Sequence, residues 1–173
     1  MQSSLGDAPK PRKFLADAAE RTVLIVDDDQ SVRSMLGFVF QDEGFQVHEA
    51  ADGVQALDVL RQGAPDVMIL DLMMPRVDGH GVLRARRDEA LAPDCRIVIL
   101  TAKSDPADSV WCWELGADEY FNTPVDPDRL FREVGALLRC TPEEIRVRRA
   151  SGLAEAKRLD AMEAAFKPKR RLR

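Results

Sequence analysis

The sequence predicts an α/β protein built on one parallel β-sheet, and two observations support this prediction. The first is a set of three short apolar runs, rich in β-branched residues, of the kind found in strands that are buried on both faces of a sheet. These runs are Thr22–Val26, Val67–Leu70 and Ile97–Leu100. The second is that apolar residues recur at helical spacing after each run, and strands that alternate with helices form parallel sheets covered by helices.

The remaining elements complete a regular alternation of strand and helix. In chain order they are a first helix marked by Val32, Leu36, Val39 and Phe40, a second strand at Gln46–Ala50, a second helix marked by Val54, Leu57 and Leu60, a third helix from about His80 to Ala90, a fourth helix begun by Asp105-Pro106, a short fifth strand at Tyr120–Phe121, and a fifth helix begun by Asp126-Pro127. An Asp followed by Pro is a favourable helix start, because the Asp caps and the Pro takes the first helical position. Five such units predict a flavodoxin-like (βα)5 doubly wound parallel sheet, with strand order 2-1-3-4-5.

Charge and composition divide the 173 residues into three segments. Residues 1–20 are expected to be a flexible N-terminal arm, residues 21–140 the domain, and residues 141–173 a helical extension with a basic tail. Residues 1–140 hold 15 Lys or Arg against 25 Asp or Glu, whereas residues 141–173 hold 10 against 5.

The C-terminal extension begins with a capping box, in which the side chains of Thr141 and Glu144 each accept a hydrogen bond from the backbone N–H of the other residue. Helix formers continue to about Phe166, apart from Ser151-Gly152, and predict one helix of about 26 residues, roughly 40 Å long. Two arrangements fit this helix: a short coiled coil with a second copy, which would make a homodimer, or an arm that extends the last helix of the domain. The apolar stripe is too sparse to choose between them.

Several classes of protein are excluded by composition. No apolar run approaches the roughly 20 residues that cross a bilayer, so no membrane association is expected. Three widely spaced cysteines, Cys95, Cys112 and Cys140, indicate reduced thiols and a cytoplasmic location. With His48 and His80 as its only histidines, the chain does not favour a histidine-based zinc site or a Ser-His-Asp triad.

Oxygen-bearing side chains follow three of the predicted strands. Asp27 and Asp28 follow the first strand, Asp71 follows the third, and Thr101 ends the fourth. Ligands of open α/β sheets bind beyond the carboxyl ends of the strands, so these groups are expected to converge on one pocket. Such a pocket suits a hard divalent cation, with which a carboxylate can receive a phosphoryl group. The alternative is a helix cap, which we favour for Asp29 but not for Asp27 or Asp28.

With these residues placed, the chain resembles a response-regulator receiver domain of two-component signal transduction over about Arg21 to Arg139. The resemblance depends on an ordered set of motifs: the acidic pair Asp27-Asp28, the segment from Asp71 to Gly79 that begins Asp-Leu-Met-Met-Pro, the pair Thr101-Ala102, the segment Gly116-Ala117-Asp118-Glu119-Tyr120, and the step Thr123-Pro124. Any one motif could occur by chance, but the ordered set is specific.

The resemblance implies a role for each of these residues. Asp71 is the phosphoacceptor, and Mg²⁺ is held by Asp27, Asp28, Asp71 and the backbone carbonyl of Met73. Thr101 donates its hydroxyl to a phosphoryl oxygen, and Tyr120 is the aromatic that rotates with the loop after Thr101. An ordinary half-buried tyrosine with a satisfied hydroxyl is compatible with that role.

One position departs from the family pattern. Receivers normally carry a lysine before the proline of the fifth strand, and this chain has Thr123, which brings no positive charge. The Thr123-Pro124 bond is expected to be cis, as the corresponding bond in the family usually is. Lys103 is a hypothesis for part of the missing charge, although a solvated loop lysine is the interpretation that we favour.

These expectations define a phosphorylated switch rather than an enzyme, although receivers assist their own phosphotransfer and dephosphorylation. A sensor histidine kinase or histidine phosphotransfer protein is expected to donate the phosphoryl group, and a downstream protein to bind the face of the fourth helix, fifth strand and fifth helix. The alternative, motivated by Thr123, is a pseudo-receiver that acts as a phosphorylation-independent interaction module. Nucleic-acid binding by the basic tail is not favoured, because such runs are more often solvated termini.

Overall fold

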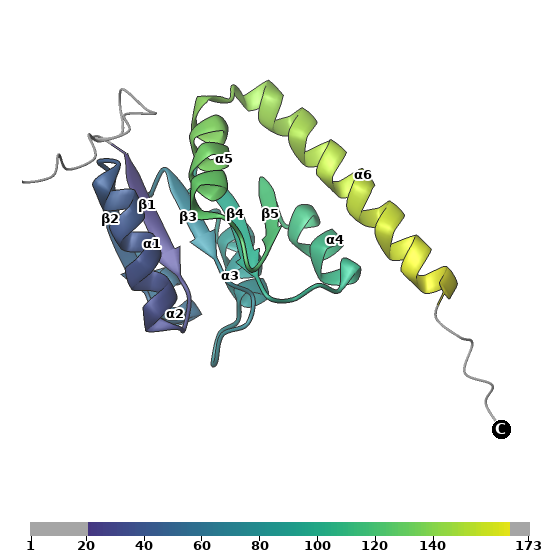
Figure 1. The fold of residues 1–173 in the computed structure, drawn as a ribbon, viewed down its shortest axis with the longest axis horizontal. Helices are drawn as coiled ribbons and strands as arrows, with labels where there is room; N and C mark the ends of the chain where they lie inside the picture. Colours follow the sequence, from purple (N-terminus) through teal and green to yellow (C-terminus); the bar gives the residue numbers. More distant parts are fainter. Residues whose placement is uncertain (1–20, 167–173) are drawn as a thin grey trace, which may run out of the picture.

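Five parallel strands form one sheet in the order β2-β1-β3-β4-β5, as the sequence predicts (Figure 1). The computed structural model describes residues 21–166, so the predicted N-terminal arm and the basic end Lys167–Arg173 lie outside the described residues. The strands are β1 (Thr22–Val26), β2 (Gln46–Ala50), β3 (Val67–Leu70), β4 (Arg96–Thr101) and β5 (Glu119–Asn122). The helices are α1 (Gln30–Asp42), α2 (Gly53–Gln62), α3 (Gly79–Asp88), α4 (Pro106–Glu114), α5 (Pro127–Arg139) and α6 (Pro142–Phe166).

Helices cover both faces of the sheet, because alternate residues of each buried strand point to opposite sides. On one side, Val23 and Ile25 of β1 pack with residues of α1 and α5. On the other side, Leu24 and Val26 of the same strand pack with residues of α2, α3 and α4. All four of these side chains are buried, and full burial of such a side chain contributes about 1.5–3 kcal/mol.

The predicted helix starts are confirmed by their caps. The carboxylate of Asp29 accepts a hydrogen bond from the backbone N–H of Ser31 at 2.7 Å, so Asp29 caps α1. Asp105 and Asp126 cap α4 and α5, each with Pro in the first turn. Gly44 follows α1 with a φ of +97°, a conformation that glycine adopts without the steric cost of a Cβ atom.

The long C-terminal helix differs from one of the two predicted arrangements, the arm that extends α5, and pairing with a second copy stays a prediction. Cys140 has extended backbone dihedrals and ends α5, and Thr141 starts α6 with the predicted capping box, in which Glu144 Oε2 accepts from the backbone N–H of Thr141 at 2.7 Å. The prediction of an arm that extends the fifth helix is therefore wrong. Helix α6 is continuous through Ser151 and Gly152 and ends at Phe166, as the sequence predicts. It runs back across the domain beside α4 (Figure 1).

None of the helices in residues 21–166 has both the length and the apolar character that spanning a membrane requires.

Candidate functional site

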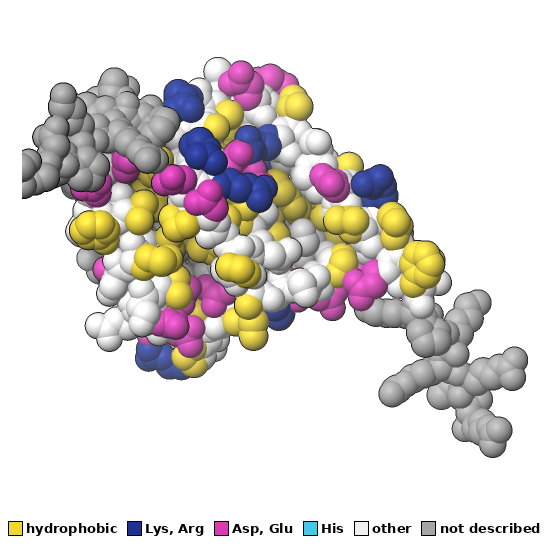
Figure 2. All heavy atoms as spheres, in the orientation of Figure 1, with side chains coloured by type: hydrophobic (Ala, Val, Ile, Leu, Met, Phe, Trp, Pro, Cys, Tyr) yellow, Lys and Arg dark blue, Asp and Glu magenta, His cyan; other side chains and the backbone are white. Residues whose placement is uncertain are grey.

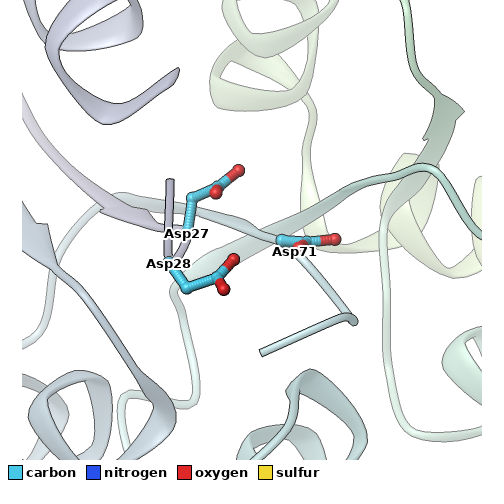
Figure 3. A group of neighbouring side chains, drawn as sticks. All are labelled: Asp27, Asp28 and Asp71. Carbon is cyan, nitrogen blue, oxygen red and sulfur yellow. The ribbon is translucent and has the colours of Figure 1, made fainter. Parts of the chain in front are cut away.

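Three carboxylates meet at the carboxyl edge of the sheet. Asp27 and Asp28 follow β1, and Asp71 follows β3, the strand next to β1 in the sheet. One oxygen from each of these residues lies within 4.8 Å of the others, and Figure 3 shows the three side chains near one another beyond the ends of the two strands. Strand pairing fixes this arrangement, because the backbone N–H of Asp71 donates to the carbonyl of Val26 at 2.9 Å.

The electrostatics of this cluster suit a divalent cation. Burial raises the pKa of Asp27 to about 6, the backbone N–H of Asp29 opposes that rise, and the negative charges of Asp71 and Asp28 add to it. The Oδ1 atom of Asp71 is buried and has no hydrogen-bond partner. Buried polar atoms usually have one, so this oxygen calls for a ligand. The three carboxylates, with the unsatisfied oxygen of Asp71 among their atoms, form a donor set of the type that Mg²⁺ prefers.

Two hydrogen bonds fix the backbone of Asp27. The backbone N–H of Asp27 donates to the carbonyl of Ala50 in β2 at 3.2 Å. Its carbonyl accepts from Nη1 of Arg33 in α1 at 2.7 Å. Arg33 also pairs with Glu49 at 3.4 Å. Sequence reasoning missed Arg33, which gives no signal beyond its place in the first turns of the helix after the acidic pair.

The loop after Asp71 is anchored to α2. Arg76, which has a φ of +66°, pairs with the carboxylate of Asp52. Asp52 is 2% exposed and also caps α2 through the N–H of Val54 at 2.8 Å. A Cβ atom on Gly79 would lie 2.4 Å from the carbonyl of Asp71, so this position excludes any larger residue. Met73, the predicted carbonyl ligand, lies within this loop with its side chain exposed.

Thr101 lies at the same edge of the sheet as Asp71. It ends β4, which pairs with β3 in a register that sets Leu70 opposite Ile99. Its side chain is 1% exposed, and its Oγ1 accepts from the backbone N–H of Lys103 at 3.2 Å. Its carbonyl accepts from the N–H of Thr123 at 2.9 Å.

Of the predicted residues at the fifth strand, Tyr120 lies within β5 and Thr123 directly follows its end. The side chain of Thr123 is exposed, and the Thr123-Pro124 bond is cis, as expected. Tyr120 is half-buried, and its hydroxyl donates to the carbonyl of Lys103 at 3.0 Å. Burial raises the pKa of Tyr120, so the hydroxyl stays protonated and able to donate. Tyr120 is thereby tied to the loop that follows Thr101.

Lys103 is held by α4. Its Nζ lies 3.0 Å from Oδ2 of Asp108, and the other oxygen of Asp108 lies 3.3 Å from Nε2 of His80. The ammonium group is thus already paired, and its predicted role beside the phosphoryl group stays a prediction. Sequence reasoning missed Asp108 and His80, because they come from two helices and form no local motif.

Comparison with known proteins shows the family. The response regulator receiver domain model matches residues 23–135, and the chain belongs to this family. It is 41% identical over 128 residues to the DNA-binding response regulator MtrA of Mycobacterium tuberculosis, which covers 74% of this chain and 55% of MtrA. It is 44% identical over 119 residues to the probable transcriptional regulator ycf27 of Guillardia theta, covering 69% of this chain and 46% of ycf27. The chain thus spans about half the length of these relatives.

Solved structures agree with the fold. The chemotaxis protein CheY4 of Vibrio cholerae superimposes with a TM-score of 0.63 at 31% identity, over 68% of this chain and 98% of CheY4. The response regulator TrrA of Thermotoga maritima, solved in complex with Mg²⁺ and BeF, superimposes with a TM-score of 0.60 at 32% identity, over 68% of this chain and 98% of TrrA. Both likenesses support the assignment to the receiver family.

Proposed function

We propose that this receiver domain is a phosphorylated switch in which Asp71 accepts one phosphoryl group. The observation that carries the proposal is the buried, unpartnered Oδ1 of Asp71 within a cluster of three carboxylates. A carboxylate oxygen of Asp71 attacks the phosphorus, a new P–O bond forms, and the bond to the donor's leaving group breaks with its electron pair. The hydroxyl of Thr101 then donates to an oxygen of the transferred group.

Oxygens of Asp27, Asp28 and Asp71 and the carbonyl of Met73 would hold Mg²⁺. When bound, Mg²⁺ neutralises charge on the phosphoryl oxygens, which otherwise repel the attacking carboxylate. The structure of TrrA with Mg²⁺ and BeF, a relative of the same fold, supports this choice of cation. Arg33 and the pair of Arg76 with Asp52 keep the loops that carry these ligands in place.

A histidine kinase or a histidine phosphotransfer protein is the proposed donor, and a downstream protein the proposed target. A homodimer through α6 remains a prediction. The domain is not proposed to be a metabolic enzyme. The three cysteines are free thiols, which supports a cytoplasmic location. DNA binding, named for MtrA, is not carried over, because the receiver model accounts for residues 23–135 and the chain spans about half of MtrA.

The test is incubation of the full chain with acetyl phosphate and Mg²⁺, followed by intact mass spectrometry. We expect a mass gain of one phosphoryl group that disappears in Asp71→Asn. Asp94→Asn, in the exposed loop before β4, is the matched control and should keep the gain. Uptake by Asp71→Asn equal to that of the native chain contradicts the assignment of the phosphoacceptor.

The second candidate is a phosphorylation-independent interaction module. It is favoured by the exposed, uncharged Thr123 and by the pairing of the Lys103 ammonium group with Asp108, which leave the acidic cluster without an evident lysine partner. This candidate predicts no phosphoryl uptake and no Mg²⁺ affinity in the same experiment.

A further inference from the structure

Helix α6 covers the side of the domain formed by α4 and β5. It packs along α4, and Ile145 and Ala156 of α6 are 2% and 3% exposed. Beyond α4 the last turns of α6 carry Leu159, Met162 and Phe166, which are 46%, 51% and 84% exposed. Hydrophobic side chains line this distal part of the helix in Figure 2. Burial is therefore confined to the part of α6 that lies on the receiver domain.

A glycine of α6 lies against a tryptophan of α4. A Cβ atom on Gly152 would lie 2.5 Å from ring atoms of Trp113, so the backbone of α6 lies directly on the indole. Glycine is a poor helix former, and here the close approach requires it. The fit is specific to a residue without a side chain at this position.

Ion pairs join α6 to carboxylates at β5 and on the neighbouring helices α4 and α5. Arg148 donates through Nε to Glu119 at 3.1 Å and through Nη2 to Glu133 of α5 at 2.8 Å. Arg149 lies 2.7 Å from Asp118, and Lys157 lies 2.8 Å from Glu114 of α4. Figure 2 shows basic and acidic side chains gathered between α5 and α6. Three basic side chains of α6 thus pair with carboxylates of the receiver domain.

A chain of contacts links this cover to the carboxylate cluster. The loop after Thr101 is bonded to Tyr120 by the carbonyl of Lys103 and to α4 by the ammonium group of Lys103. A cavity of about 270 Å³ lies under α6, lined by Tyr120, by loop residues such as Ser104 and by Ala156 of α6. A shift of this loop therefore moves atoms that α6 rests on, and the cavity gives Tyr120 room to move.

We propose that α6 is a releasable cover: it occupies the face formed by α4 and β5 in the resting protein, and a phosphoryl group on Asp71 loosens it. The second part, in which the phosphoryl group loosens α6, rests on the proposed function. When the hydroxyl of Thr101 turns to the phosphoryl group, Thr101 draws the loop of Lys103 toward Asp71, and the contacts of that loop with Tyr120 and Asp108 change. Helix α4 moves with Asp108, and the fit of Trp113 against Gly152 is lost.

Hydrogen–deuterium exchange of the full chain tests this proposal, because a helix with little packing is marginal in water and exchanges fast. Mg²⁺ with beryllofluoride serves as the probe for a phosphoryl group. We expect exchange of residues 142–166 to rise at least several-fold when the probe binds, while β1 and β3 stay protected. Fluorine NMR of the same sample reports separately whether beryllofluoride is bound.

The outcomes separate the two proposals. Bound beryllofluoride with unchanged exchange of α6 overturns the releasable cover and leaves the proposed function standing. Absence of bound beryllofluoride overturns the proposed function, and the trigger fails with it. Bound beryllofluoride with faster exchange in α6 and in the loop around Lys103 supports both proposals.

Two variants test the cover without any ligand. Gly152→Ala should raise the exchange of α6 several-fold, because the added methyl group collides with Trp113, whereas Ser151→Ala on the exposed side should behave as the native chain. Arg148→Gln removes the pairs with Glu119 and Glu133 without adding bulk and should have the same direction of effect. Native exchange of α6 in both Gly152→Ala and Arg148→Gln overturns the proposal.

Discussion

Arg149 of α6 reaches the fully buried carboxylate of Asp118, with its Nε 2.7 Å from Oδ1. The other oxygen of Asp118 accepts the backbone N–H of Ile97 in β4 at 2.8 Å. A buried carboxylate is costly unless both oxygens are satisfied. Asp118 therefore joins three parts of the molecule: the strand it precedes, the neighbouring strand and the C-terminal helix.

Replacing Arg149 with Ala should destabilise the protein, because Asp118 would stay buried and lose its positive partner. A hydrogen bond to a charged group contributes about 1.5–3 kcal/mol, and we expect the free energy of unfolding to fall by about 2 kcal/mol. Urea denaturation followed by circular dichroism measures this loss. Arg158→Ala, on the exposed side of α6, should change it by less than about 0.5 kcal/mol. Equal losses in the two variants would show that the pair with Asp118 is unimportant.

Mg²⁺ should stabilise the domain through the three carboxylates, since the cation offsets their mutual repulsion. At about 100 times its dissociation constant, a ligand adds about 2.7 kcal/mol, which corresponds to roughly 5 to 10 °C in melting temperature. Differential scanning fluorimetry with and without a chelator measures the shift. Asp28→Asn should abolish most of it, and Asp94→Asn should leave it intact. A native-sized shift in Asp28→Asn argues against the proposed ligand set.

Restoring a lysine at position 123 should speed phosphorylation. The side chain of Thr123 is exposed, so a longer one fits, and its ammonium group would offset the charge of the incoming phosphoryl group. We expect Thr123→Lys to raise the rate of uptake from acetyl phosphate about tenfold, or about 1.4 kcal/mol in the barrier. Thr123→Met, similar in length and uncharged, is the control. A rate increase shared by both variants would point to side-chain length instead of charge.

The three cysteines should differ sharply in reactivity. Cys95 and Cys112 are 1% and 0% exposed, and burial raises the pKa of each thiol to about 12. Because a raised pKa keeps a thiol protonated, the thiolate fraction at pH 9 stays at about one in a thousand. Iodoacetamide should label only the half-buried Cys140 in the native chain between pH 7 and pH 9. Peptide mass spectrometry reads the labelled sites, and labelling in urea should reach all three.

The sheet could be predicted because its three central strands, β1, β3 and β4, are buried on both faces, which leaves apolar β-branched runs in the sequence. Its order was predicted as the natural choice for five alternating strand and helix units, that of a flavodoxin-like sheet. The helix starts were equally readable, since Asp29, Asp105 and Asp126 act on the backbone within two residues of themselves. Local chemistry of this kind does not depend on distant parts of the chain.

The carboxylate cluster could be predicted as well, because strand ends converge at one edge of a parallel sheet. The contacts that hold the neighbouring loops could not be predicted. Arg33 donates to a backbone carbonyl, and Arg76 pairs with Asp52 from a separate loop. Neither contact leaves a spacing in the sequence. Whether the cluster binds Mg²⁺ and accepts a phosphoryl group stays a prediction.

The docking of α6 was missed for a different physical reason. The docking depends on a glycine and two arginines, and on sequence alone Gly152 interrupted the helix formers while Arg148 and Arg149 gave no signal of a partner. The apolar stripe, the usual signal of a packed helix face, is thin because backbone contact with Trp113 and ion pairs replace much of it.

Dissolved salt should govern how firmly this protein keeps its C-terminal helix in place. Attraction between partly exposed charges fades over about 8 Å at physiological ionic strength and over about 3 Å in molar salt. The pairs of Arg148 and Lys157 are partly open to solvent. The helix is therefore held most tightly at low ionic strength. Trp113, which α6 contacts, should be less accessible to solvent in dilute buffer than in concentrated salt.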